Sequence, residues 1–357
     1  MVRLAYRGFL VLVLAALLAA CAGPAAAPTA TPVMPPSPVV AADAIQTEPP
    51  SAMPIPVIWD DDGSIDGVTA LLYFLQNPGY EVKAATVSPG IAHPGIFAAN
   101  LTQFFTLLGE EDIPVAAGPE QPLAGDTAFP DEWRVASDQF WDLELPTAAV
   151  PVDQRSASQL IIDTIKGSDQ PVTLFISGPL TNLAQALRDD PSIKDGIRSV
   201  EIMGGAVKAP GNVDSSPAEW NIYVDPVAAS EVFSSGLALH LIPLDATDQV
   251  QWSEDDAAAW DASSAPASSV AAQFLRRTLR DWASSRVLIW DLVAAESAAN
   301  PELCRWQEFH LEVAQAGAAN EGQTVAISDQ PANVSVCTAP DVEGYKNAAK
   351  EVFAKTR

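Results

Sequence analysis

Positive charge is scarce in this chain of 357 residues. Lysine and arginine together number 19 against 45 aspartates and glutamates, so the formal net charge is -26 at pH 7. Binding to nucleic acid or to an anionic lipid surface requires an excess of basic residues. The composition therefore argues against both as partners. Histidine and cysteine are equally sparse, with three residues each.

The N-terminus lacks an apolar run long enough for an ordinary membrane span. Residues 9–20 are apolar, follow two arginines and have the length of the central region of a signal peptide. The run ends in Leu-Ala-Ala-Cys, which resembles the bacterial lipobox. This resemblance implies that residues 1–21 form a lipoprotein signal peptide and that Cys21 is lipidated. We therefore expect an exported protein, anchored at the outer face of a bacterial membrane or in the periplasm.

The rest of the chain divides into two regions. Residues 22–54 are mainly alanine, proline and threonine with almost no charge, a composition that cannot bury a core and predicts a disordered tether. Residues 55–357 alternate apolar runs with helical patterns and show no second low-complexity break. This alternation predicts a single α/β domain with an open, mostly parallel sheet flanked by helices.

Cys304 and Cys337 remain once Cys21 is assigned to the lipid. They are an even pair in an exported protein, which favours a disulfide. Their spacing and the absence of nearby histidines do not suit zinc.

A stretch of acids follows the first predicted strand. Residues 57–59 are apolar, Asp60, Asp61 and Asp62 follow directly, and a helical pattern begins after Asp66. The acids therefore lie at the carboxyl end of a strand, where open α/β sheets bind ligands. Four carboxylates within seven residues repel one another, which indicates a hard cation.

Two interpretations of these acids stay open. Period-two alternation places Asp60 and Asp62 on one side of the strand and Asp61 on the other, so Asp60 is expected to join Asp62 at a metal while Asp61 points away. Alternatively, Asp66 caps the helix and the other acids form a solvated turn.

The same strand, turn and helix order recurs along the chain. Strands are predicted at 82–87, 113–116 and 200–203, and residues 172–191 are predicted to form a strand, a Gly-Pro turn and a helix with Thr181 as its N-cap. A further helix is predicted at 97–108. Residues 118–151 form a long segment without a clear period, expected to be a flap. A polar loop carries amide and carboxylate groups suited to hydroxyl recognition, namely Asn212, Glu219 and Asn221. His240 and His310 lie in apolar runs and are expected to be structural.

Six motifs in order resemble one family. DDDGSID, SGPLTN, MGGAV with GNV, AEWNIYVDP, PLDAT and a Trp-Asp pair before a helix are similar to the inosine-uridine-preferring nucleoside hydrolases, from residue 57 to about 341. In that family the acidic motif Asp-x-Asp-x-x-x-Asp-Asp binds calcium. The resemblance implies that Asp62 is a calcium ligand and Asp66 the general base. The fourth acid is Gly67 here, so Asp60 is the candidate to compensate, and Gly67→Asp is expected to tighten calcium binding.

The remaining motifs extend the resemblance to the rest of the site. The backbone carbonyl of Ser177 and the carboxylate of Asp291 are implied as further calcium ligands. Trp290 stands where the family usually has the histidine that protonates the leaving base. Asn212, Glu219 and Asn221 are implied to hold ribose hydroxyls. His93 lies near the place of a ribose-binding asparagine, with a plain surface role as the alternative.

The implied activity is hydrolysis of the N-glycosidic bond of a ribonucleoside or a related ribosyl compound. A water held by calcium attacks the sugar and Asp66 takes its proton, while Trp290, Trp220 or Trp133 stacks on the base. The alternative is a surface lipoprotein that binds nucleosides or ribose without hydrolysing them. The sequence names neither the base nor the oligomeric state, a homo-oligomer included.

Overall fold

The computed structural model describes residues 53–282, 286–315 and 317–355. The expected signal peptide, Cys21 and nearly all of the expected tether lie outside these residues. Within them, no helix combines the length and the apolar character needed to cross a membrane.

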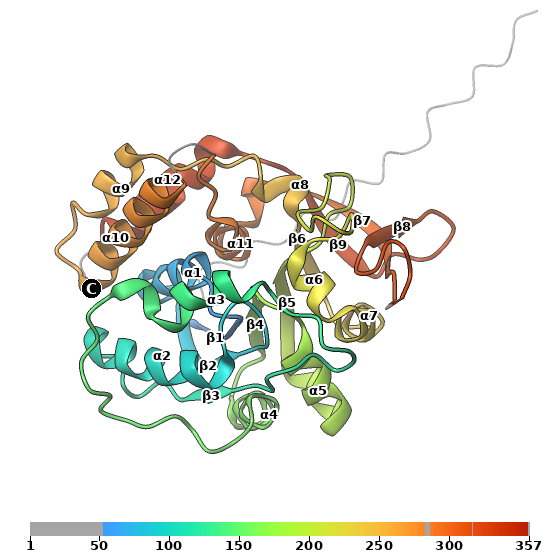
Figure 1. The fold of residues 1–357 in the computed structure, drawn as a ribbon, viewed down its shortest axis with the longest axis horizontal. Helices are drawn as coiled ribbons and strands as arrows, with labels where there is room; N and C mark the ends of the chain where they lie inside the picture. Colours follow the sequence, from blue (N-terminus) through green and yellow to red (C-terminus); the bar gives the residue numbers. More distant parts are fainter. Residues whose placement is uncertain (1–52, 283–285, 316, 356–357) are drawn as a thin grey trace, which may run out of the picture. The chain divides into compact units, whose positions relative to one another are not determined.

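A single nine-stranded sheet runs through the domain in the order β3-β2-β1-β4-β5-β6-β9-β7-β8 (Figure 1). Neighbouring strands from β3 to β9 are parallel, and β7 pairs antiparallel with both β9 and β8. The expectation of an open, mostly parallel sheet is confirmed. The strands are β1 Ile55–Asp61, β2 Tyr80–Val87, β3 Val115–Ala117, β4 Val172–Ile176, β5 Ile197–Met203, β6 Leu239–Ile242, β7 Cys304–Val313, β8 Thr324–Ile327 and β9 Val334–Pro340.

Twelve α-helices connect and cover the described strands. Helices α1, α10, α11 and α12 pack together, and α4, α5 and α7 form a separate group (Figure 1). The helices are α1 Ile65–Gln76, α2 Pro94–Leu108, α3 Asp131–Asp138, α4 Ala157–Gly167, α5 Thr181–Asp189, α6 Trp220–Val224, α7 Pro226–Phe233, α8 Leu244–Thr247, α9 Glu254–Trp260, α10 Pro266–Asp281, α11 Trp290–Ala299 and α12 Val342–Phe353. Short 3-10 turns occur at Phe140–Asp142, Pro191–Gly196 and Pro301–Leu303.

Alternation along the strands divides the core into two layers. On β1, Trp59 belongs to the layer that contains α1 and α11, whereas Ile58 belongs to the layer that contains α4 and α5. Both side chains are fully buried. Because both faces of the parallel strands are covered, β1 and β4 are apolar throughout their middle residues.

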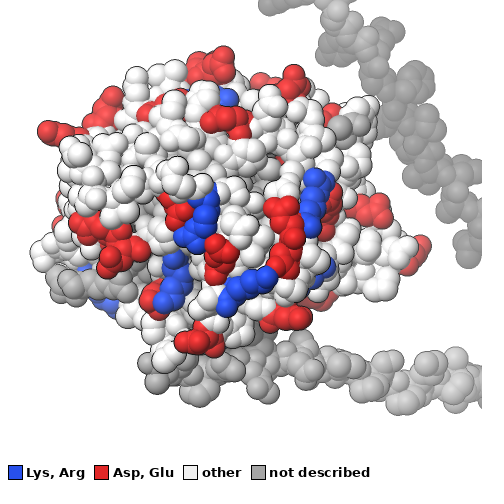
Figure 2. All heavy atoms as spheres, turned by 90° about the horizontal axis from the view of Figure 1, so that it is seen from below, with Lys and Arg blue, Asp and Glu red and all other residues white. Residues whose placement is uncertain are grey.

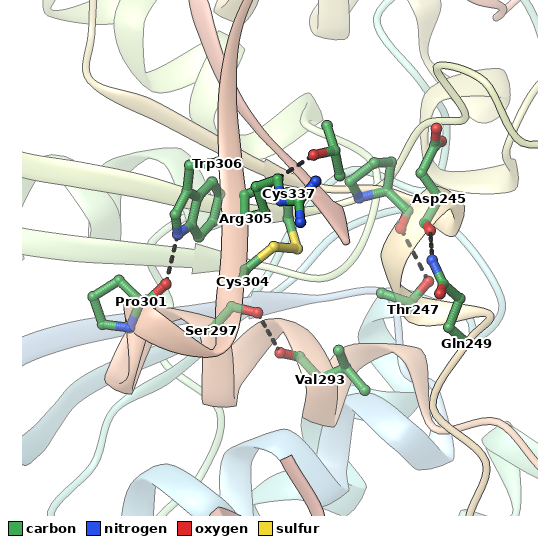
Figure 3. Close-up of a disulfide and its surroundings, with 12 residues drawn as sticks. Asp245, Thr247, Gln249, Val293, Ser297, Pro301, Cys304, Arg305, Trp306 and Cys337 are labelled. Carbon is green, nitrogen blue, oxygen red and sulfur yellow. Dashed lines mark hydrogen bonds between the residues drawn. A yellow bond between two sulfur atoms is a disulfide. The ribbon is translucent and has the colours of Figure 1, made fainter. Parts of the chain in front are cut away.

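The C-terminal strands are joined covalently. Cys304 at the start of β7 and Cys337 in β9 form a disulfide, with their Cα atoms 5.6 Å apart (Figure 3). This is the pairing expected from the cysteine count. The neighbouring Trp306 indole donates a hydrogen bond to the carbonyl oxygen of Pro301 at 2.8 Å.

Several local expectations differ from the structure. The N-cap of α1 is Ser64 rather than Asp66, because the Ser64 hydroxyl accepts from the backbone N–H of Gly67. Thr181 is the first residue of α5 instead of its N-cap, and its hydroxyl donates to Asp225. The long segment 118–151 contains α3, and Asn221 lies in α6 instead of a loop. Helices α3 and α6 are short, so sequence periodicity does not reveal them, and periodicity does not fix the first residue of α1 or α5.

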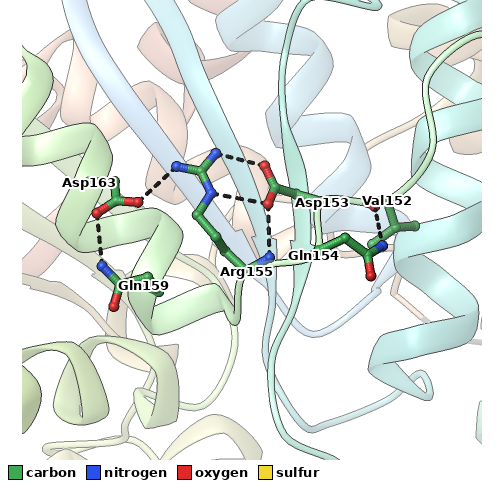
Figure 4. A network of polar contacts seen from close by, with 6 residues as sticks. All are labelled: Val152, Asp153, Gln154, Arg155, Gln159 and Asp163. Atoms are coloured by element: carbon green, nitrogen blue, oxygen red, sulfur yellow. Dashed lines mark hydrogen bonds and ion pairs between the residues drawn. The ribbon is translucent and has the colours of Figure 1, made fainter.

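Acidic and basic side chains lie against each other on the surface. Figure 2 shows one face on which lysines and arginines are interspersed with aspartates and glutamates. Arg155 illustrates the arrangement, since its guanidinium contacts Asp153 at 2.6 Å and Asp163 at 2.9 Å (Figure 4). We call these three residues the Arg155 network.

Candidate active site

A cavity of about 630 Å³ opens at the carboxyl ends of β1, β4 and β5. Its wall includes Asp62, Ser177 and Met203, which follow or end these three strands. The strand order reverses between β1 and β4, and open α/β sheets bind ligands at such a reversal. The cavity is therefore where the fold itself favours a site.

Asp62 is the first residue after β1 and lies on the cavity wall with 2% of its surface exposed. It accepts a hydrogen bond from the backbone N–H of Ile91 at 3.2 Å. Two glycines give it room. A Cβ on Gly90 would lie 2.3 Å from an Asp62 carboxylate oxygen, and a Cβ on Gly178 would lie 2.9 Å from the Cβ of Asp62.

The structure reverses the expected directions of Asp60 and Asp61. Asp60 accepts hydrogen bonds from the Thr86 hydroxyl and the Asn182 amide, both at 2.7 Å. Neither Asp60 nor Asp61 lines the cavity, and both are fully buried. Asp61 instead accepts from the Ser177 hydroxyl at 2.7 Å, and its charge acts on Asp62. The alternation rule fails because β1 ends at Asp61, so the chain has already begun to turn at Asp62.

Ser64 connects the acidic turn to the distant Asp291. Its hydroxyl donates to an Asp291 carboxylate oxygen at 2.8 Å and lies 3.4 Å from a carboxylate oxygen of Asp61. Asp66, in the first turn of α1, accepts hydrogen bonds from the backbone of Trp290 and Asp291 at the start of α11. The N-termini of α1 and α11 therefore lie next to each other.

Four buried carboxylates come together here, and we call them the acidic cluster: Asp61, Asp62, Asp66 and Asp291. Burial raises the pKa of each, to about 7 for Asp61. Repulsion from other members raises the pKa of Asp61, Asp62 and Asp291 further. The largest causes of these shifts include no lysine or arginine, and Arg277, which also lines the cavity, pairs with Asp142 and Asp281. The cluster is therefore short of positive charge.

The donor chemistry of the acidic cluster fits a hard cation. Carboxylate and carbonyl oxygens are the ligands that calcium prefers, and buried like charges require a counter-ion. Over the ranges that the structure describes, however, no three His, Cys, Asp or Glu side chains already form a metal-binding group. Hydrogen bonds through Ser64 and Ser177 join Asp61 to Asp291 and to the end of β4 instead.

Three further polar side chains of the cavity wall, which we call the polar wall, are those expected to contact a sugar. Glu219 caps α6, and burial raises its pKa to about 7. Asn221 donates to the carbonyl oxygens of Met203 at 3.2 Å and Ser177 at 3.3 Å. Asn212 accepts from the backbone N–H of Trp220 at 3.0 Å. All three line the cavity, so the structure brings them together with Asp62, Asp66 and Asp291.

Aromatic rings form much of the remaining wall. Phe129 and Trp220 stack with their ring centroids 4.6 Å apart, and Trp133 lies edge-on to Trp220 at 5.6 Å. Trp282 meets Trp290 edge-on at 5.8 Å, and the Trp290 indole donates to Asp248 at 2.8 Å. The wall therefore suits a flat apolar group.

The three histidines lie outside this cavity wall. His93 pairs with Asp138, its Nδ1 lying 2.7 Å from a carboxylate oxygen. His240 pairs with Glu201 at 2.9 Å, and His310 contacts the carbonyl oxygen of Pro331. The structure thus gives His93 a carboxylate partner rather than a place on the cavity wall.

Sequence reasoning missed several residues of the site. Ser64 precedes the Gly67 N–H by three residues, which is an N-cap signal in the sequence. Phe129, Arg277 and Trp282 also line the cavity, Phe129 from an irregular segment and the other two from the C-terminal end of α10. Only the fold brings such residues to the site, and no local pattern marks them.

Comparison with known proteins supports one family. A family model described as inosine-uridine preferring nucleoside hydrolase matches residues 57–347. The pyrimidine-specific ribonucleoside hydrolase RihA of Citrobacter koseri is 32% identical over 312 residues, which is 85% of this chain and 99% of that protein. RihA of Escherichia coli is 31% identical over 303 residues, covering 82% of this chain and 96% of that protein.

Solved structures agree with this match. A purine-preferring ribonucleoside hydrolase from Gardnerella vaginalis superposes with a TM-score of 0.73 at 26% identity, covering 84% of this chain and 98% of that one. A plant nucleoside hydrolase gives a TM-score of 0.74 at 26% identity, covering 85% and 100%. The similarity therefore extends over the domain rather than over a single motif.

Proposed function

Because this chain belongs to the family of inosine-uridine preferring nucleoside hydrolases, we propose that it hydrolyses the N-glycosidic bond of ribonucleosides to ribose and free base. One observation carries the proposal. Buried carboxylates, hydroxyl-binding side chains and stacked aromatic rings share one cavity at the reversal point of the sheet. These are the groups that a polar sugar attached to a flat base requires.

The sugar lies between Asp62 and the polar wall in this proposal. Glu219, Asn221 and Asn212 have oxygen or amide groups suited to the ribose hydroxyls, and each is fixed by hydrogen bonds to the backbone. Because these side chains are already fixed, binding the sugar would cost less conformational entropy than binding by mobile side chains.

Calcium is the proposed cation, and the carboxylates of Asp62 and Asp291 and the Ser177 carbonyl would hold it. When bound, it would supply positive charge that makes a water molecule more acidic and attracts the ribose hydroxyls. Asp66 would accept a proton from the water that attacks the anomeric carbon, through a transition state with oxocarbenium character. Burial raises the pKa of Asp66, which makes it a stronger base than a surface aspartate.

In this proposal the base lies against the aromatic rings of the cavity when the glycosidic bond breaks. Trp220, Trp133 and Trp290 offer ring faces or edges for stacking. Trp290 occupies the position of the expected leaving-group histidine, and its indole N–H is already engaged by Asp248. Departure of the base would therefore rely on its own lability, or on protonation from solvent or from another residue.

Release of reducing sugar tests the proposal. The full-length protein is incubated with uridine, cytidine, inosine and adenosine, with and without a calcium chelator. Uridine and cytidine are tested first, because the RihA relatives are named pyrimidine-specific. We expect release with at least one nucleoside, inhibition by chelator and loss in Asp66→Asn. Asp153→Asn, on the surface, is the control. Absence of release from every nucleoside rejects hydrolysis.

A second function, binding without hydrolysis, has one observation in its favour. No three acids in the described residues already form a metal-binding group. Calorimetric titration with ribose and nucleosides separates the two, since heat of binding without sugar release identifies a binding protein.

We also propose that Cys21 carries the lipid anchor of an exported protein, on the basis of the lipobox resemblance. Cys21→Ser should release the protein from membranes in a fractionation experiment. Retention of this variant in the detergent phase to the same extent as the parent rejects the anchor.

A further inference from the structure

A side chain at position 67 would overlap with the carboxylate of Asp61. A Cβ built on Gly67 would lie 1.9 Å from one carboxylate oxygen of Asp61, 2.6 Å from the other and 2.4 Å from the carbon between them. No real Cβ makes such contacts. With Asp61 as the structure places it, position 67 has room for no side chain.

The backbone does not explain this glycine. Gly67 lies in the first turn of α1 with helical geometry and no positive φ. Glycine in a helix is less favourable than alanine by roughly 1 kcal/mol. The space taken by the Asp61 carboxylate is therefore the structural reason for glycine at this position.

The start of α1 is also fixed in place. The Gly67 N–H donates to the Ser64 hydroxyl at 2.8 Å, and the Gly67 carbonyl accepts from the Trp59 indole at 3.1 Å. Trp59 is fully buried. Because both backbone groups are held, the helix cannot move away to admit a side chain without losing these bonds.

Asp61 is oriented toward the cluster by three donors. Its carboxylate accepts from the backbone N–H groups of Gly63 at 2.7 Å and Ser64 at 3.1 Å, and from the Ser177 hydroxyl at 2.7 Å. It also lies within 3.4 Å of the same Ser64 hydroxyl that contacts Asp291 at 2.8 Å. A carboxylate at the end of β1 thus approaches one that lies 230 residues further along the chain.

We propose that Asp61 supplies, from strand β1, the cation-binding carboxylate that position 67 of helix α1 lacks. The proposal rests on the calcium site of the proposed function and adds to it a residue specific to this chain. The Asp61 carboxylate occupies the volume that the first atoms of a side chain at position 67 would fill. The substitution at position 67 therefore relocates a carboxylate instead of deleting it.

Calcium affinity across a double-mutant cycle tests this relocation. The full-length protein is purified in detergent, stripped of metal and titrated with calcium by calorimetry. Asp61→Asn keeps the shape of the side chain and should weaken calcium binding at least tenfold. Contrary to the expectation from the sequence, Gly67→Asp alone should not tighten binding and should lower the melting temperature, because it adds a side chain where Asp61 already lies. Asp61→Ala combined with Gly67→Asp should regain most of the parent affinity.

Two controls isolate the effect of charge at this point. Asp61→Ala with Gly67→Ala fills the same space without a carboxylate and should stay weak. Asp60→Asn removes the adjacent buried acid, which bonds to Thr86 and Asn182, and should change calcium affinity less than threefold. Melting temperatures in chelator confirm that each variant is folded.

The outcomes separate this inference from the proposed function. Parent-like calcium affinity in Asp61→Asn, tighter binding in Gly67→Asp alone, or no calcium binding by the parent overturns the inference. Ribose release by the parent is measured separately. If calcium binding depends on Asp61 but no nucleoside is hydrolysed, the inference stands and the proposed function fails.

Discussion

The acidic cluster and the Arg155 network contain the same kind of side chain under opposite conditions. In the Arg155 network, hydrogen bonds from the guanidinium lower the pKa of Asp153 and of Asp163 (Figure 4). In the acidic cluster, burial raises the pKa of every member, and no described cation offsets it. Carboxylates on the surface are thus stabilised as anions, whereas those at the cavity are held in a setting that disfavours the anion.

This difference shows that the fold retains a group of carboxylates that lowers its own stability. Buried like charges are unfavourable for folding, and proteins retain such groups mainly where a ligand uses them. The surface pairs contribute little because water and salt screen them. The cluster should therefore dominate activity, and the surface network should affect neither activity nor stability strongly.

Removing an acid from the cluster should have the largest effect. Asp62→Asn should lower the rate of nucleoside hydrolysis by about 10²-fold or more, because it takes away a carboxylate that we propose as a ligand of the cation. The same variant should be at least as stable as the parent in chelator, since it also removes repulsion. Steady-state kinetics and thermal melting measure the two effects. Equal activity in Asp62→Asn and Asp163→Asn would remove the contrast between the two regions.

Supplying the missing positive charge should have the next largest effect. Calcium at 100 times its dissociation constant should stabilise the folded protein by about 2.7 kcal/mol, because it binds the folded cluster and not the unfolded chain. Chemical denaturation with calcium and with chelator measures this. Magnesium is the control, since it fits a flexible oxygen site less well. Identical unfolding curves in calcium and chelator would contradict the prediction.

Glu296 is fully buried but does not line the cavity, so it tests whether burial alone raises a carboxyl pKa and lowers stability. Burial raises its pKa well above the usual range, with a smaller opposing effect from the Ala349 backbone. A carboxyl whose folded pKa is raised contributes stability at low pH and loses it as the pH rises through that pKa. Glu296→Gln should therefore add roughly 1 to 3 kcal/mol to the free energy of unfolding at pH 8, and less at pH 5.

Denaturation at the two pH values checks this expectation for Glu296. The exposed Glu302→Gln is the matched control and should leave both values unchanged. A gain for Glu296→Gln that is the same at pH 5 and pH 8 would mean that ionisation is not its cause.

The smallest effect is expected at the surface. Arg155→Gln should lower the free energy of unfolding by less than about 1 kcal/mol at pH 7. Since the pKa of Asp153 is lowered, this contribution is present above the ordinary carboxyl pKa and is lost as the pH falls through the lowered value. Denaturation at low and high salt measures it, and an effect that salt does not reduce would contradict simple surface pairing.

The parallel sheet and the position of the site could be predicted from the sequence. Apolar runs of four to eight residues mark buried strands, and acids directly after such a run mark the end at which ligands bind. Asp62, Asp66, Ser177 and Asp291 gather near the cavity because each lies next to a strand end or a helix start. Local pattern is sufficient for residues of this kind.

The direction of individual side chains could not be predicted in the same way. Alternation holds only while the strand continues, and β1 ends one residue before Asp62. The overlap between Asp61 and Gly67 depends on how α1 returns toward β1, which no spacing rule contains. Phe129 reaches the cavity from an irregular segment and Trp282 from the C-terminal end of α10, so their roles depend on the whole fold.

The aromatic wall also gives this protein an optical property. The chain has nine tryptophans, and five of them line the cavity in the described structure: Trp133, Trp141, Trp220, Trp282 and Trp290. Trp133 and Trp282 are 47% and 43% exposed, so their emission should lie at longer wavelength than that of fully buried Trp59 and Trp260. A base that stacks on the wall displaces water from these rings and should shift and quench their fluorescence. Occupancy of the site should therefore be readable from intrinsic fluorescence, without a label and whether or not the bound nucleoside is cleaved.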